Sequence, residues 1–239
     1  MPNELLLLLS VVLIFSGVLV FFHFFGTEGL FCWIVLATIA ANIEVMILVE
    51  AFGLEQTLGN VMFASTFLVT DIISEISGKK NAVKAVNIGI VTALSFIVVS
   101  QLWLLFTPAG PDWAFPYIQG VFTNTPRIML AGLVVYAIVQ RLDVWAYHKW
   151  WQFTSQRFGD ARKFLWLRNN GSTLISQAIN AVLFTFFAFG GIYDLPTLLH
   201  ICLASYIIFI FTSLLDTPAV YVARYLHERK LAKQKNSAA

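Results

Sequence analysis

The chain has 239 residues, of which 59% are apolar and only 12% charged, and its formal net charge is +2. Soluble domains average about 25% charged residues, so this composition excludes an ordinary water-soluble globule and indicates an integral membrane protein. The small net charge argues against a nucleic-acid partner, because proteins that bind nucleic acid carry a marked excess of Lys and Arg.

Seven apolar stretches are long enough to cross a lipid bilayer. About 20 apolar residues in a helix span a hydrocarbon core of roughly 30 Å. In chain order the stretches cover residues 5–25, 30–52, 58–76, 83–106, 122–146, 173–191 and 198–221. We therefore predict an all-α fold, a polytopic membrane helix bundle, that forms one integral membrane domain over residues 1–239.

The basic residues predict how this bundle is oriented. Lys79 and Lys80 follow the third stretch, a second basic group lies within residues 149–168, and the tail at 226–239 is basic. Loops rich in Lys and Arg stay in the cytoplasm, so we predict an external amino terminus and a cytoplasmic carboxyl terminus. The first residues lack the positive start of a secretory signal, so the first stretch is expected to be a transmembrane helix.

The sequence lacks the motifs of common enzymes and of nucleotide-driven pumps. GxxxxGK[ST], HExxH and GxSxG are all missing. Cys32 and Cys202 lie within apolar stretches, and the four histidines are too scattered for metal-ligand spacing. We predict that the chain is not an enzyme, that it holds no metal or cofactor, and that any transport it performs alone is secondary.

Polar side chains within the apolar stretches are the candidate functional residues, since an ionisable group costs about 2.5–3.5 kcal/mol at the centre of a transmembrane helix. Asp71 and Glu75 are i,i+4 neighbours on one face of the third stretch. Glu75 either snorkels toward Lys79 and Lys80 or contributes to a site. We expect Asp71 to face a cavity or the bundle interior, where it could bind substrate or a coupling proton.

The second and fifth stretches add further candidates. Asn42 and Glu44 are expected near the middle of the membrane on different faces of one helix, and Glu44 is the stronger candidate because a carboxylate is costlier to bury than an amide. Arg127 lies at the outer end of the fifth stretch. It either snorkels just after Pro126 or pairs with a carboxylate such as Glu44 or Glu50.

Two more polar groups lie in the fifth and sixth stretches. Gln140 and Asp143 are i,i+3 neighbours near the inner end of the fifth. Thr173, Gln177 and Asn180 follow helical spacing and form a polar stripe, which we expect to face protein or a cavity rather than lipid. The predicted substrate-binding set is Asn42, Glu44, Asp71, Glu75, Arg127, Gln140, Asp143, Gln177 and Asn180.

Three blocks of sequence resemble the bacterial queuosine precursor transporters, also called the vitamin uptake transporter family. The blocks are ASTFLVTDIISEISGKK, PRIMLAGLVVYAIVQRLDVWAYHKW and LWLRNNGSTLISQAINAVLFTFFAFGG, and the likeness covers roughly residues 40–225. Family motif residues fall on Thr70, Asp71, Arg127, Gln140, Asp143, Val144, Trp166, Leu167, Ser172 and Thr173. Asn180 departs from the pattern, since the family usually has Asp there.

The resemblance implies a secondary transporter that imports a 7-deazaguanine base, such as 7-cyano-7-deazaguanine, 7-aminomethyl-7-deazaguanine or queuine, across the bacterial cytoplasmic membrane. It also implies a six-helix core over residues 29–225, with residues 1–28 as an extra first helix. Phe63, Phe67 and Phe184 are candidates to stack on the purine-like base. The alternative is a membrane subunit that binds a vitamin-like solute and depends on a separate ATPase module, and the oligomeric state is open between a monomer and a homodimer.

Overall fold

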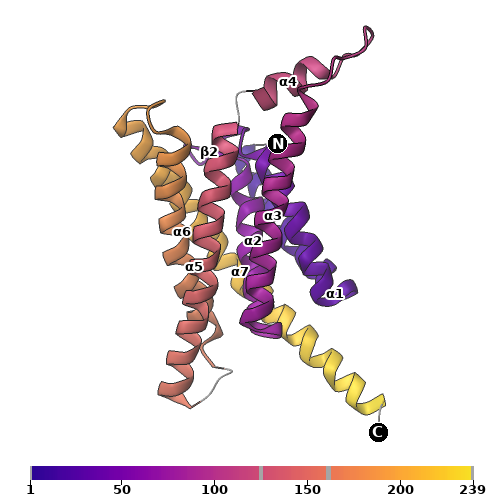
Figure 1. Ribbon diagram of the computed structural model, residues 1–239. Helices are drawn as coiled ribbons and strands as arrows, with labels where there is room; N and C mark the ends of the chain where they lie inside the picture. The colour runs from indigo at the N-terminus through magenta and orange to yellow at the C-terminus, as the bar shows by residue number, and fades with distance from the viewer. Residues whose placement is uncertain (1, 124–125, 160–162, 238–239) are drawn as a thin grey trace.

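The structure is a computed structural model that describes residues 2–123, 126–159 and 163–237. Its helices form one elongated bundle, which confirms the predicted all-α, polytopic fold class (Figure 1). They are α1 (Asn3–Glu44), α2 (Gly59–Ser77), α3 (Lys79–Trp103), α4 (Phe115–Thr123), α5 (Pro126–Phe158), α6 (Leu165–Phe189) and α7 (Leu195–Ser237). Helices α1, α3, α5, α6 and α7 are each long and apolar enough to cross a membrane, so this is a multi-pass membrane protein.

Helix α1 contains the first predicted stretch and the second as far as residue 44, folded back against each other. Its helical geometry breaks at Gly26, whose φ of 64° is a conformation that glycine adopts without steric cost. The two halves then pack side by side, with the rings of Phe21 and Trp33 5.2 Å apart. Trp33 also lies so close to Gly17 that a side chain there would clash with its ring. The two halves of α1 therefore supply two separate crossings of the bundle.

The second predicted stretch is wrong beyond residue 44. Helix α1 ends at Glu44, and the chain then forms an antiparallel hairpin from β1 (Leu48–Ala51) and β2 (Leu54–Thr57). The turn residues Phe52 and Gly53 both have positive φ, as two-residue hairpin turns require. A short apolar run of β-branched residues has no periodicity that separates a helix from a strand, which explains the error.

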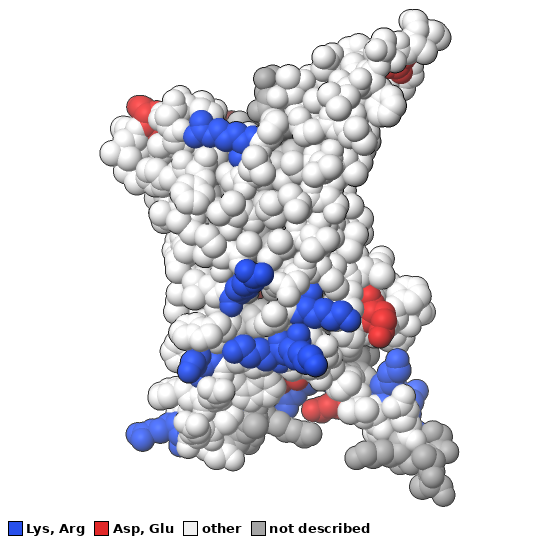
Figure 2. Space-filling view, viewed as in Figure 1, with Lys and Arg blue, Asp and Glu red and all other residues white. Residues whose placement is uncertain are grey.

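The two ends of the bundle differ in their contents. Asn3 donates a hydrogen bond to the carbonyl of Glu50, so the start of the chain lies beside the β-hairpin, and we call this the hairpin end. At the other end, which we call the tail end, the hydroxyls of Thr27 and Ser77 are 3.1 Å apart. The two termini lie at opposite ends of the molecule (Figure 1). On the face drawn in Figure 2, Lys and Arg gather mainly at the tail end.

Helix α2 occupies the centre of the bundle, where it packs against α1, α3, α5 and α7. It is less apolar than the spanning segments of those five helices, because it carries polar residues that are buried against other helices rather than exposed to lipid. One large apolar cluster joins Val11 and Phe15 of α1 to Ile72 of α2 and Val86 of α3. The first half of α1 thus contributes to the main core, and the division into an extra helix and a six-helix core stays a prediction.

Candidate functional site

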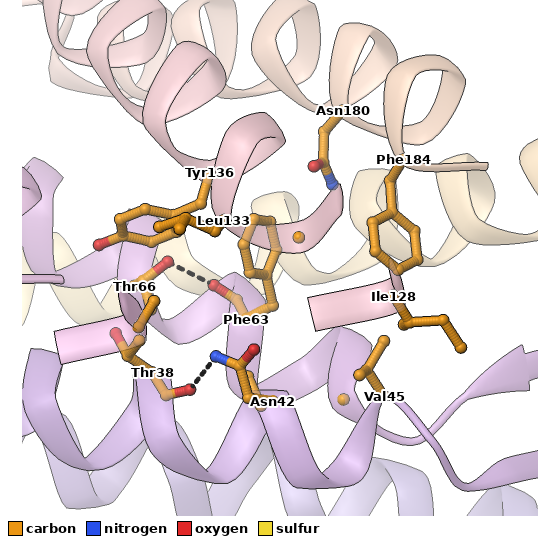
Figure 3. A pocket seen from close by; sticks show the side chains of 14 residues that line it. Thr38, Asn42, Val45, Phe63, Thr66, Ile128, Leu133, Tyr136, Asn180 and Phe184 are labelled. Carbon is orange, nitrogen blue, oxygen red and sulfur yellow. Dashed lines mark hydrogen bonds between the residues drawn. The ribbon is translucent and has the colours of Figure 1, made fainter. Parts of the chain in front are cut away.

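A cavity of about 70 Å³ lies in the half of the bundle nearest the hairpin end (Figure 3). It is lined by the end of α1 and by α2, α3, α5 and α6. Its polar lining comes from Thr38, Asn42, Thr66, Tyr136 and Asn180, and its aromatic lining from Phe63 and Phe184. Figure 3 shows the Asn180 amide extending from α6 toward the space between the two phenylalanine rings. The cavity therefore combines amide groups with aromatic faces.

Local contacts orient the polar lining. The Nδ2 of Asn42 donates to the carbonyl of Thr38 at 2.7 Å, and the Nδ2 of Asn180 donates to Oε1 of Gln177 at 3.2 Å. Tyr136 is 4% exposed and packs edge-on against the Phe63 ring, with centroids 6.0 Å apart. Both amides are thus held by neighbours before any ligand arrives.

A chain of hydrogen bonds leads from the cavity into the interior of the bundle. The Nε2 of Gln140 donates to Oγ1 of Thr66 at 2.6 Å, and the hydroxyl of Thr70 donates to Oε1 of Gln140 at 3.3 Å. All three side chains are fully buried. Thr66 lines the cavity, while Thr70 precedes Asp71 on α2. The wall of the cavity is therefore continuous with a buried polar region.

Two fully buried carboxylates lie in this polar region. Oδ2 of Asp71 accepts a hydrogen bond from Thr173 at 3.2 Å, and Oδ1 of Asp143 accepts one from Ser176 at 2.7 Å. Within the described residues, the second oxygen of each carboxylate has no hydrogen-bond partner. The Thr173 hydroxyl also lies close to Asp143, so it stands beside both acids. We call Asp71, Asp143, Thr173 and Ser176 the carboxylate layer.

An ionic network joins the helices between this layer and the tail end of the bundle. Both carboxylate oxygens of Glu75 lie 2.7 Å from Nη2 of Arg168, and Oε2 also accepts from the Tyr147 hydroxyl at 2.8 Å. Arg224 adds a second ion pair to Glu75 at 3.2 Å. The Arg168 guanidinium lies 4.4 Å from the centroid of the Trp151 ring, a cation–π contact. We call Glu75, Tyr147, Arg168 and Arg224 the tail-end clamp, because it ties α2, α5, α6 and α7 together.

Seven of the nine predicted binding residues fall at three levels of one buried column. Asn42 and Asn180 line the cavity, and Gln140 and Gln177 bond to residues that line it. Asp71 and Asp143 form the acids of the carboxylate layer, and Glu75 belongs to the tail-end clamp. Binding of a substrate by any of these residues stays a prediction.

The remaining two predicted residues lie apart from this column. Glu44 is the last residue of α1 and lies at the hairpin end, not at the middle of the bundle as expected. Arg127 is exposed, and its guanidinium donates to the carbonyls of Phe187 and Gly190 at the end of α6. Of the two alternatives for Arg127, the described residues provide no carboxylate partner, and the exposed guanidinium agrees with the snorkelling one. A cation at a helix carboxyl terminus satisfies carbonyls that have no partner within the helix.

Sequence reasoning missed some residues that the fold brings to the site. Arg168 was assigned to a cytoplasmic loop, yet its side chain is fully buried. The signal was present, because Arg168, Ser172 and Ser176 continue the polar face of α6 at helical spacing. Thr38 and Tyr136 were also missed, since a single polar group in an apolar stretch is not distinctive. Of the candidate stacking rings, Phe63 and Phe184 line the cavity, whereas Phe67 does not line it and is fully buried against Phe63, with ring centroids 5.4 Å apart.

A multi-pass bundle with a partly polar cavity between its helices has the architecture of a membrane transport protein, and comparisons with known proteins agree. The family model described as "Putative vitamin uptake transporter" matches residues 57–223, so the chain belongs to this family. The matched region includes α2, α5 and α6, and with them the carboxylate layer and most of the residues that line the cavity.

A curated relative in Bacillus subtilis (strain 168), named "Probable queuosine precursor transporter", is 40% identical over 210 residues. The match covers 88% of this chain and 90% of the relative. No solved structure matches the chain. These findings confirm the family resemblance drawn from the three sequence blocks, and the family and the relative are both described as transporters rather than enzymes.

Proposed function

We propose that this protein is a secondary transporter that imports a queuosine precursor, a 7-deazaguanine base, across the bacterial cytoplasmic membrane. The observation that carries the proposal is the cavity, which sets the amides of Asn42 and Asn180 beside the rings of Phe63 and Phe184. Amides both donate and accept hydrogen bonds, as the edge of a guanine-like base requires, and aromatic rings stack on its faces. The name of the Bacillus subtilis relative supports the same class of substrate.

The neutral Asn180 suits an uncharged base. A carboxylate at this position would need to be neutralised inside the membrane, whereas an amide can pair without leaving a buried charge. The cavity of about 70 Å³ is well below the roughly 300–1,000 Å³ of typical ligand pockets. A bicyclic base therefore requires the lining side chains to move apart, and the half-buried Phe63 and Phe184 are the rings best placed to do so.

The distribution of charge supports entry from outside. Lys and Arg gather at the tail end, which favours a cytoplasmic tail end and an external hairpin end (Figure 2). In this orientation the cavity lies in the outer half of the membrane, and the tail-end clamp separates it from the cytoplasm. A base captured from outside would then be released into the cytoplasm only after the clamp opens.

The test uses bacteria that cannot synthesise 7-deazaguanine bases. Cells receive low concentrations of 7-cyano-7-deazaguanine, and queuosine in their tRNA is measured by mass spectrometry with and without this gene. We expect queuosine to depend on the gene, and Asn180→Ala to lower it about tenfold at limiting dose, because hydrogen bonds to the base are lost. The control is Asn87→Ala, the same change on the exposed face of α3. Equal queuosine with and without the gene at every dose would refute the proposal.

Uptake by the purified protein tests whether the chain acts alone. Liposomes that contain only this protein should take up labelled 7-cyano-7-deazaguanine, with guanine and adenine as competitors to define specificity. Uptake that appears only after a separate ATPase module is added would instead identify the chain as a solute-binding subunit.

A further inference from the structure

The interior of the bundle holds more carboxylates than cations. Asp71, Asp143 and Asp216 are each at most 2% exposed, and the side chain of Glu75 is 5% exposed. In the part of the chain that the structure describes, the ion pairs made by these four acids all involve Glu75, which binds both Arg168 and Arg224. The three aspartates are surrounded by hydroxyl and amide groups instead.

An ionised carboxylate in this environment is costly. Removing it from water without a countercharge costs several kcal/mol even after the surroundings relax. The charge of Asp216 is partly stabilised, because the Asn169 amide donates a hydrogen bond to Oδ1 of its carboxylate at 2.7 Å.

Asp71 accepts the Thr173 hydroxyl and Asp143 accepts the Ser176 hydroxyl, with the hydroxyls of Ser172 and Thr173 also close to Asp143. Among the described residues, Oδ1 of Asp71 and Oδ2 of Asp143 accept no hydrogen bond. Two adjacent acids with a spare oxygen each have the chemistry to hold a proton.

We propose that Asp71 and Asp143 form the proton-binding site of this transporter, and that one proton crosses the membrane with each molecule of base. The inference rests on the proposed function. A proton from the hairpin end binds Oδ1 of Asp71 or Oδ2 of Asp143, which neutralises one acid. It leaves toward the tail end when the clamp opens, and the site returns to its starting charge.

The surroundings of the site favour a proton over a metal ion. In the described ranges, no group of three or more His, Cys, Asp or Glu side chains could hold a metal. The titratable groups that act on the Asp71 carboxylate are Asp143 and Tyr147 on α5, Asp216 on α7, and Glu75 on α2 itself. Three of these are acids, and their repulsion raises the benefit of a bound proton. The arginines of the clamp are already engaged with Glu75.

The polar column connects this site to the cavity. Thr173, Gln177 and Asn180 lie on one face of α6, with Thr173 bonded to Asp71 and Asn180 in the cavity wall. Occupation of the cavity can thereby influence the acids through a single rigid helix face. On the other side, the positive charge of Arg168 lies between the acids and the tail end, and it opposes leakage of protons while the clamp is closed.

Coupling is tested with purified protein in liposomes without sodium. With one proton per base, labelled 7-cyano-7-deazaguanine should accumulate about tenfold for each pH unit by which the outside is more acidic. A dye inside the liposomes should report acidification when base is added. Asp71→Asn and Asp143→Asn should abolish accumulation yet still exchange labelled for unlabelled base. The matched control is Asp194→Asn, on the exposed connection between α6 and α7, which should behave as wild type.

Three outcomes overturn the proposal: accumulation that follows a sodium gradient, accumulation that needs no gradient, or variants that accumulate base as well as wild type does. Absence of both uptake and exchange would refute the proposed function instead. In that case infrared difference spectra of the purified protein, recorded across a pH series, still decide the proton site. The C=O band of a protonated carboxyl should appear in wild type and weaken in both variants. Spectra without such a band would overturn it.

Discussion

Glu75 and Asp71 lie one helical turn apart on α2, in surroundings of opposite character. Glu75 binds two arginines and a tyrosine hydroxyl, whereas Asp71 receives one hydrogen bond from Thr173. Both acids are buried, so burial alone does not distinguish a structural acid from a functional one. The two acids differ in how completely their partners satisfy the charge.

The same contrast separates the two halves of the bundle. At the tail end, the side chains of the tail-end clamp form ion pairs and hydrogen bonds with one another, so each has its partner within the protein. The half near the hairpin end contains a cavity, half-buried rings and amides that can accept a ligand. We therefore expect substitutions at the tail end to lower stability, and substitutions around the cavity to alter ligand binding.

The largest expected effect is that of Glu75→Gln. Loss of the carboxylate leaves Arg168 buried without a countercharge, which should lower the free energy of unfolding by about 3–5 kcal/mol. Denaturant titration in detergent micelles, followed by tryptophan fluorescence, measures this change. The double variant Glu75→Gln/Arg168→Gln should recover part of the loss. An unchanged unfolding free energy would remove the distinction between the two halves.

Gly89→Ala should have the next largest effect. A Cβ at position 89 would lie 2.1 Å from the hydroxyl oxygen of Tyr136, so the ring must move, and it forms part of the cavity wall. Overpacking of this kind costs about 1–3 kcal/mol. We expect weaker binding of 7-cyano-7-deazaguanine, measured by equilibrium dialysis. Gly120→Ala on α4, where no atom lies within 4 Å of the new Cβ, is the control. Binding equal to the control would contradict the assignment of the cavity.

Arg127→Ala should have a small effect on stability. The guanidinium is exposed and bonds to carbonyls at the end of α6, an interaction worth at most about 1 kcal/mol. Arg127→Lys keeps the charge near the helix end and should recover some of this. The shift in thermal unfolding in detergent measures both variants. A loss as large as that of Glu75→Gln would mean that the hairpin end also depends on a buried charge.

Asp71→Asn should change stability least. The amide oxygen can still accept the Thr173 hydrogen bond, and the change removes a charge that has no cationic partner among the described residues. We expect the free energy of unfolding to stay within about 1 kcal/mol of wild type, or to rise, because the amide has the same shape and a buried charge without a countercharge is itself destabilising. Destabilisation comparable to that of Glu75→Gln would place Asp71 among the structural acids.

The sequence by itself determined the class of the protein and the approximate positions of its apolar helices. Length, hydropathy and helical spacing are local properties, so they predict the membrane spans and the polar stripe of α6 without knowledge of the fold. The clustering of Lys and Arg likewise predicts which loops share one side of the membrane. The three family blocks could be recognised for the same reason, because each is a continuous run of residues.

Only the tertiary structure decided which polar groups meet. Arg168 pairs with Glu75 across 93 residues, and Thr173 reaches Asp71 across 102. Hydropathy cannot predict such pairs, because it measures the cost of burying a group and carries no information about which helices become neighbours. The carbonyl partners of Arg127 also depend on packing, because they lie on α6 and at its end, 60 and 63 residues away in the chain. Packing of the helices thus determined that one acid on α2 is neutralised by arginines while its neighbour, one turn away, keeps a free oxygen.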